Sequence, residues 1–212
     1  MKEAFETSEI RGVLHRPEQA NGDAIALTHG AGSNCEAALL VRLAEEFANR
    51  GYLVLRYDLP FRRLRAGGSP MPSGAAKDRE GVASAVAALR QMTGGRIYAA
   101  GHSYGGRQSA MAASERPEMA SGLLLLSYPL HPPQRPEQKR TSYFPDLRTP
   151  ALFVHGTKDP FGSLEELRKA LTLIPARTDL LVVDRAGHDL KKAGTLAGEI
   201  LEKLRAVVSA TK

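Results

Sequence analysis

The pentapeptide Gly101-His102-Ser103-Tyr104-Gly105 lies between an apolar run at residues 97–100 and a helix-like stretch at residues 106–114. A strand that turns at once into a helix needs glycine on both sides of the turn, because the two backbones pass too closely for side chains. The serine between them takes up strained backbone angles that expose its Oγ. The N–H of Tyr104 then lies at a helix N-terminus, where it can face a developing negative charge. The stretch therefore predicts an exposed, nucleophilic Ser103.

Apolar runs of strand length alternate with helical patterns along the rest of the chain. Residues 3–16 predict an antiparallel hairpin at a sheet edge. Five further strands besides residues 97–100 are predicted at residues 24–28, 52–57, 122–127, 151–154 and 180–183. Helices are predicted from a cap at Ser33 or Asn34 to Gly51 and at residues 77–92, 106–114, 164–173 and 190–208. The segments 61–73 and 128–149 are rich in proline, and we expect irregular loops there.

Strands that are apolar throughout are typical of a parallel sheet covered on both faces. The predicted fold class is therefore α/β, with a doubly wound, mostly parallel sheet and helices on both faces. A chain of 212 residues is short enough for one core, and we expect residues 1–212 to form a single domain. In such sheets ligands bind beyond the carboxyl ends of the strands.

The composition is that of an ordinary globular protein, with 42% hydrophobic and 25% charged residues. No apolar run approaches the roughly 20 residues that cross a membrane, and the acidic N-terminal segment lacks the apolar core of a signal peptide. The single cysteine, Cys35, excludes an internal disulfide and suits a reducing compartment. We expect a cytoplasmic protein without a membrane partner, in which Cys35 is an unreactive helix residue.

The net charge of +6 and pI near 9.6 are compatible with nucleic-acid binding. However, no predicted helix carries a dense basic stripe, and aromatic residues make up only 6% of the chain. We therefore expect no nucleic-acid partner. The sequence also contains neither a metal-ligand spacing nor a phosphate-binding glycine loop, so we expect neither a metal nor another cofactor.

Two more polar residues follow strands at the same predicted edge of the sheet. Asp159 comes after the strand at residues 151–154, and His188 comes after the last strand. A serine that attacks an acyl carbon needs a base, a carboxylate that orients the base, and donors for the oxyanion. The sequence therefore predicts a catalytic triad of Ser103, His188 and Asp159, with the Ala31 and Tyr104 amides as oxyanion donors.

The order Ser103, Asp159, His188 and the strand–turn–helix context resemble the α/β-hydrolase superfamily from about Ala24 onward. The absence of a separate cap domain resembles the small dienelactone-hydrolase-like branch. Residues 105–107 (Gly-Gly-Arg) and 128–133 (Tyr-Pro-Leu-His-Pro-Pro) are similar to a group of predicted hydrolases related to a subunit of a nuclear acetyltransferase complex. Members of that group often carry lysine before the serine and methionine after it, where this chain has His102 and Tyr104.

The predicted site residues also have alternatives. Ser103 could cap the helix after it, Asp159 could cap the helix after Pro160, and His188 could be a surface histidine. Asp184 is the alternative carboxylate partner of the imidazole, and Gly32 is the alternative oxyanion donor. Three further polar residues just past strands are predicted to be structural: His29, Asp58 and His155.

The triad predicts a serine hydrolase that cleaves an ester or thioester of a small substrate through an acyl-enzyme. The same triad could cleave an amide or peptide, and the resemblance to a complex subunit leaves a non-catalytic interaction role as the other alternative. Six basic residues lie in the two loops expected near Ser103: Arg62, Arg63, Arg65, Arg135, Lys139 and Arg140. We therefore expect an anionic acyl substrate, with Arg62, Arg63 and His131 as substrate-binding residues.

Overall fold

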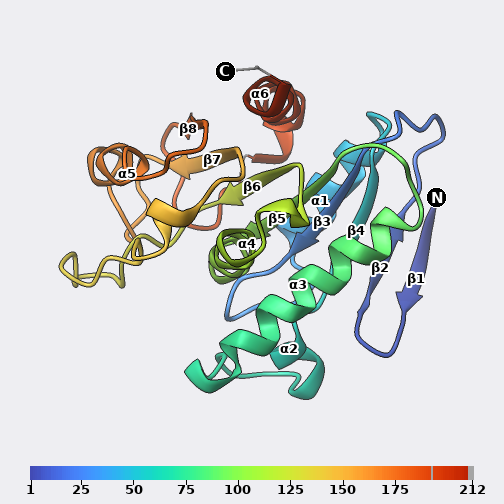
Figure 1. Ribbon diagram of the computed structural model, residues 1–212, viewed down its shortest axis with the longest axis horizontal. Helices are drawn as coiled ribbons and strands as arrows, with labels where there is room; N and C mark the ends of the chain where they lie inside the picture. The colour runs from blue at the N-terminus through green and yellow to red at the C-terminus, as the bar shows by residue number, and fades with distance from the viewer. Residues whose placement is uncertain (192, 210–212) are drawn as a thin grey trace.

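The computed structural model describes residues 1–191 and 193–209 and contains one eight-stranded sheet (Figure 1). The strands are ordered β1-β2-β4-β3-β5-β6-β7-β8. Their bounds are β1 Lys2–Glu6, β2 Arg11–His15, β3 Ala24–Thr28, β4 Leu53–Tyr57, β5 Ile97–His102, β6 Gly122–Leu126, β7 Ala151–Gly156 and β8 Thr178–Val183. The β1–β2 and β2–β4 pairs are antiparallel and every other pair is parallel. The predicted fold class and edge hairpin are confirmed.

Helices cover both faces of the sheet. Their bounds are α1 Ala38–Ala48, α2 Pro60–Leu64, α3 Ala75–Arg90, α4 Tyr104–Glu115, α5 Leu164–Leu171 and α6 Ala197–Ser209. Figure 1 shows α3 and α4 side by side on one face, and α1 and α6 contact each other on the other face. Short 3-10 turns lie at Pro72–Gly74, Pro117–Met119, Phe144–Asp146 and Ala193–Leu196.

Alternate residues of the central strands enter two separate cores. In β6, Leu123 and Leu125 pack with α3 and α4, whereas Leu124 and Leu126 pack with α1 and α6. All four side chains are fully buried. This two-sided burial explains why the strands read as continuous apolar runs.

Three helices differ from the prediction by more than two residues. Helix α1 begins at Ala38, because Asn34 Oδ1 accepts the N–H of Glu36 and forms a turn instead of capping the helix. Cys35 therefore lies before the helix. Helix α2 occupies part of the predicted loop 61–73, since Pro60 at its first turn has the φ that a helix needs. Helix α6 starts seven residues later than expected, after a 3-10 turn, and residue 192 of the predicted helix lies outside the described residues.

No helix in the described part of the chain is long and apolar enough to span a membrane. The segment between β6 and β7 contains, as regular structure, only the 3-10 turn Phe144–Asp146. The place where a cap domain could be inserted is therefore a proline-rich loop. Because β3, β5, β7 and β8 run parallel, the segments that follow them meet at one edge of the sheet, and this edge carries the candidate site.

Candidate active site

Ser103 occupies the turn between β5 and α4 in a strained conformation. Its φ of 51° and ψ of −116° fall outside the regions that L-residues usually adopt. A Cβ on Gly105 would lie 2.5 Å from the His29 carbonyl oxygen, and one on Gly101 would lie 2.4 Å from the Gly105 carbonyl carbon. Glycine is thus required on both sides of the turn, as the sequence predicts. The Ser103 side chain makes no capping hydrogen bond with α4, so the helix-cap alternative is wrong.

Ser103, His188 and Asp159 form a continuous hydrogen-bonded chain. Ser103 Oγ lies 2.7 Å from His188 Nε2. His188 Nδ1 lies 2.8 Å from Asp159 Oδ2 and 3.0 Å from Oδ1. With the Nδ1 proton donated to the carboxylate, Nε2 is free to accept the serine proton. The structure thus brings together the three side chains of the predicted triad.

Asp159 is held as a buried carboxylate. Its side chain is fully buried, which by itself would raise its pKa, but the hydrogen bonds from His188 and from the Phe161 N–H outweigh burial and lower the pKa below its usual value. The helix-cap alternative for Asp159 is wrong, because Ser163 caps α5. The other candidate, Asp184, pairs with Arg185 at the surface.

Phe161 and His102 also position the base, a role that was not predicted for either residue. The ring of Phe161 stacks on the imidazole of His188 with centroids 4.1 Å apart and planes 28° apart. His102 Nε2 donates a hydrogen bond to the backbone carbonyl of His188 at 2.7 Å. The His188 side chain is only 22% exposed, so it is not a free surface histidine. Phe161 follows Asp159 by two residues, but sequence spacing carries no signal for the stack.

The loop after β3 presents backbone N–H groups to the site. Within the described chain, the N–H groups of Ala31, Gly32 and Tyr104 have no hydrogen-bond acceptor, and all three residues line the same cavity as Ser103. An unpaired N–H beside a nucleophile is available for an oxyanion. The geometry therefore fits the predicted donors Ala31 and Tyr104, and it leaves the alternative Gly32 open.

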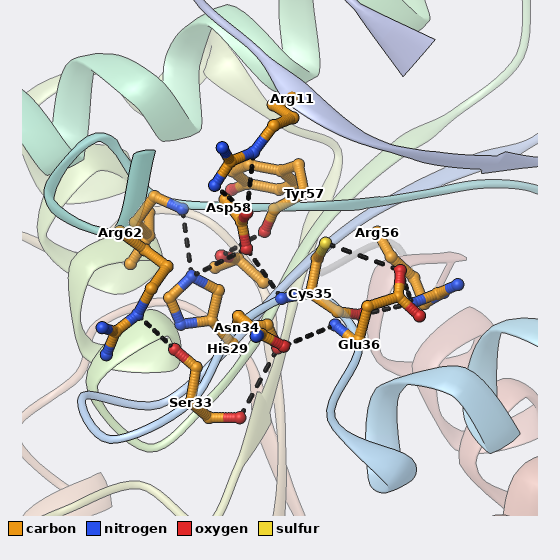
Figure 2. Close-up of polar contacts among 12 residues, drawn as sticks. Arg11, His29, Ser33, Asn34, Cys35, Glu36, Arg56, Tyr57, Asp58 and Arg62 are labelled. Carbon is orange, nitrogen blue, oxygen red and sulfur yellow. Dashed lines mark hydrogen bonds and ion pairs between the residues drawn. The ribbon is translucent and has the colours of Figure 1, made fainter. Parts of the chain in front are cut away.

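Buried polar side chains hold this loop in place (Figure 2). Asp58 accepts two hydrogen bonds from the Arg11 guanidinium and one from the N–H of Cys35. His29 donates from Nδ1 to the Gly30 carbonyl and accepts the Leu59 N–H at Nε2. Burial lowers the pKa of His29, so its ring is neutral. His29 and Asp58 are thus structural, as expected.

Cys35 and His155 are also buried, and neither is a member of the triad. Burial raises the pKa of the Cys35 thiol to about 12, which keeps it protonated and unreactive. His155 Nε2 donates to the Gly162 carbonyl at 2.8 Å and thereby fixes the segment that carries Phe161.

Arg62 also holds the loop after β3 in place, and it does not line the cavity beside Ser103. It is 4% exposed, and its guanidinium donates to the carbonyls of Ser33, Ala31, Arg65 and Gly68. The prediction that Arg62 binds substrate is therefore wrong: its donors are used within the protein, and Figure 2 shows it reaching back to Ser33.

Arg63 and His131 are also absent from the cavity wall. Arg63 donates to the Ser8 carbonyl and lines a different surface groove. His131 is 5% exposed and packs between the Pro132 carbonyl and the Glu166 carboxylate. The predictions that Arg63 and His131 bind substrate are therefore also wrong, because both side chains form their hydrogen bonds away from Ser103.

The cavity beside Ser103 has a volume of about 720 Å³. It has an apolar wall made by Pro70, Met71, Pro72, Pro129 and Phe161, and a basic wall made by Arg107 and Arg140. A cavity of this size accommodates a small organic substrate. In the described part of the chain, no three His, Cys, Asp or Glu side chains gather as a metal site.

A family model described as "Alpha/beta hydrolase domain" matches residues 21–212. The chain belongs to the α/β hydrolase family.

Solved structures agree with this assignment. The structure of this α/β hydrolase is similar to that of a dienelactone hydrolase from Anabaena variabilis, with a TM-score of 0.78, 22% identity and 97% of each chain covered. Est1E from Butyrivibrio proteoclasticus matches with a TM-score of 0.73, 18% identity and 99% of each chain covered. A serine hydrolase homologue from Coxiella burnetii has a TM-score of 0.69 and 16% identity over 98% of this chain and 95% of that one. The predicted resemblance to the cap-less, dienelactone-hydrolase-like branch is confirmed at the level of the fold.

Proposed function

We propose that this α/β hydrolase cleaves an ester or thioester of a small substrate through an acyl-enzyme on Ser103. The observation that carries the proposal is the chain from Ser103 Oγ through His188 to Asp159, with contacts of 2.7 and 2.8 Å, at the wall of a cavity of about 720 Å³. A histidine within hydrogen-bond reach of both a serine and a buried carboxylate is the arrangement that activates a serine.

In the proposed mechanism, Ser103 Oγ attacks the acyl carbon while its proton passes to His188 Nε2. Asp159 remains ionised because its pKa is lowered, and it stabilises the imidazolium. The Ala31 and Tyr104 N–H groups bind the oxyanion, and each such donor typically contributes about 3–4 kcal/mol to the transition state. The imidazolium then protonates the leaving alcohol or thiol. Water, deprotonated by His188, then attacks the acyl carbon. The bond between this carbon and Ser103 Oγ breaks, the acid leaves, and His188 returns the proton to Ser103 Oγ.

A non-catalytic interaction subunit is the alternative from another class. Such a protein has no physical need for a serine at φ 51° with an ordered base and carboxylate. Strain of this kind costs about 1–3 kcal/mol and persists at functional sites, which favours the enzyme. A cytoplasmic location is part of the proposal, because the free Cys35 thiol suits a reducing compartment.

A panel of short-chain ethyl esters, acyl thioesters and acyl amides tests the proposal with purified protein. We expect turnover of esters or thioesters that is lost in Ser103→Ala while the circular dichroism spectrum is unchanged. Exclusive turnover of amides would replace the esterase by an amidase with the same triad. No turnover of any class by folded wild-type protein would favour the non-catalytic role.

A further inference from the structure

One wall of the cavity at Ser103 carries two arginines. Arg107 lies on α4 one helical turn after Ser103, and its backbone N–H donates to the Ser103 carbonyl at 2.9 Å. Arg140 comes from the loop between β6 and β7. Both side chains line the cavity that also contains Ser103 and His188, so two cationic groups face the space that a substrate would occupy.

Neither cation is neutralised by the described chain. The side chain of Arg107 makes no hydrogen bond or ion pair with any described residue, and its buried Nε has no acceptor. Arg140 makes one side-chain hydrogen bond, from Nη1 to the Pro129 carbonyl at 3.3 Å. Arg62 differs sharply, since its guanidinium is surrounded by backbone carbonyls. A guanidinium carries five N–H donors, and those of Arg107 are not used by any described residue, so they are free to bind a ligand in the cavity that Arg107 lines.

The groups around the two arginines add no negative charge. Burial raises the pKa values of Tyr128 and Tyr143, so both hydroxyls stay protonated. Burial, followed by the charge of Arg107, lowers the pKa of Arg140. The two cations therefore repel each other in a partly desolvated space, and an anion between them would relieve that repulsion.

Hydrogen bonds and aromatic packing hold the backbone of Arg140 in place. Its backbone N–H donates to the Leu130 carbonyl at 2.8 Å, and its own carbonyl accepts the hydroxyl of Tyr128. The Tyr128 hydroxyl also contacts that of Tyr143, and both rings pack against Phe144. The arginine therefore extends from a backbone that is fixed against the core, unlike an arginine on a free surface loop.

We propose that Arg107 and Arg140 bind an anionic group of the substrate, a carboxylate or a phosphonate-like group, in the same cavity as the scissile bond. The inference rests on the proposed function and names its substrate class. Arginine is suited to this task, because its planar donors match a carboxylate or phosphate in a bidentate manner. Since Arg107 follows Ser103 by four residues, about 6 Å along the helix axis, we expect a short spacer between the anion and the scissile carbonyl.

The test compares three ethyl esters of similar size at low salt. Monoethyl glutarate carries a carboxylate, ethyl 4-phosphonobutanoate carries a phosphonate, and ethyl glutaramate carries a neutral amide. Each is assayed with wild type, Arg107→Gln, Arg140→Gln and the control Arg135→Gln. Arg135 is exposed on the same loop as Arg140 and does not line the cavity, so its removal changes the net charge equally.

We expect wild type and Arg135→Gln to prefer at least one anionic ester over the amide by about 10- to 100-fold in kcat/KM, the value of one or two charge-assisted hydrogen bonds. The preferred anion identifies carboxylate or phosphonate as the ligand. In Arg107→Gln and in Arg140→Gln the ratio should fall toward one. Equal kcat/KM for all three esters in wild type, or a preference that survives in both variants, would overturn the inference.

A binding measurement distinguishes failure of the proposed hydrolase activity from failure of the anion site. If no ester is turned over, calorimetric titration with glutarate compares wild type with Arg107→Gln. Glutarate binding that is present in wild type and lost in the variant supports the anion site without the esterase, whereas absent binding overturns the site as well. Turnover of the neutral ester without any anion preference leaves the hydrolase intact and removes only this inference.

Discussion

His102 Nε2 donates a hydrogen bond to the backbone carbonyl of His188 at 2.7 Å. The residue before the nucleophile thus holds the loop that carries the base, and the two imidazole rings lie 5.2 Å apart between centroids. Burial lowers the pKa of His102 to about 4, against the opposing effect of this hydrogen bond. His102 is therefore neutral at neutral pH and adds no charge beside His188.

This arrangement predicts a pH-dependent stability. In the unfolded chain His102 takes up a proton near its ordinary pKa of about 6.5, whereas in the folded protein it does so only near pH 4. The unfolded state binds more protons between these values, so the free energy of unfolding should fall as the pH drops from about 6.5 to 4, by up to about 1.4 kcal/mol per pH unit from this group. Urea unfolding of wild type and His102→Gln at several pH values measures it. An equally steep decline in the variant would contradict the prediction.

Asp159→Asn should keep the fold and reduce kcat by about 10⁴-fold, because the amide favours the wrong imidazole tautomer. Asp184→Asn is the matched control, since among the described residues that carboxylate pairs with Arg185 alone, at the surface. Steady-state kinetics on the best ester gives the comparison. If Asp184→Asn is the damaging change, the assignment of the orienting carboxylate is wrong.

Arg62→Gln should weaken the loop that carries Ala31. The guanidinium satisfies carbonyls of Ala31 and Ser33, and hydrogen bonds to a charged group contribute about 1.5–3 kcal/mol each. We expect a lower melting temperature together with a kcat reduced by roughly 10- to 100-fold, on the scale of a misplaced oxyanion donor. Arg63→Gln, which removes the neighbouring positive charge, should change neither property much. Similar effects of both variants would show that only charge matters.

Gly105→Ala should lower the free energy of unfolding by about 1–3 kcal/mol or more, as overpacking does. The new methyl would lie 2.5 Å from the His29 carbonyl oxygen and 2.7 Å from Thr28 Cγ2. Gly94→Ala is the control, because nothing lies within 4 Å of its added methyl. Denaturant unfolding of the two variants is the measurement. A Gly105→Ala protein as stable as Gly94→Ala would mean that the turn between β5 and α4 has room for a side chain.

The fold class and the positions of the triad could be predicted from the sequence, because each depends on a residue pattern with a single physical cause. Continuous apolar runs such as β6 occur because both faces of the sheet are buried, so the fold class could be predicted. The positions of Ser103, Asp159 and His188 follow from the same topology, since parallel strands end at one edge. Helix α2 is too short for a periodic pattern, and its start depends on Pro60 alone.

The structural role of each arginine could not be predicted from the sequence. Arg62 lies in a loop as basic as that of Arg140, yet Arg62 turns back to backbone carbonyls and Arg140 lines the cavity. Arg107 belongs to a helix, and only the packing of α4 brings it to the cavity wall, so its position there could not be predicted from the sequence. Side-chain direction decides these roles, and no residue spacing encodes it.

Labelling with a fluorophosphonate tests the central claim most directly, since the reagent reacts preferentially with an activated serine. Folded wild-type protein is incubated with the reagent, and the modified peptide is identified by mass spectrometry. We predict stoichiometric labelling at Ser103, none in Ser103→Ala and strongly slowed labelling in His188→Ala, because His188 Nε2 accepts the serine proton at 2.7 Å. A folded wild-type protein that stays unlabelled, or carries the label on another serine, would contradict the account.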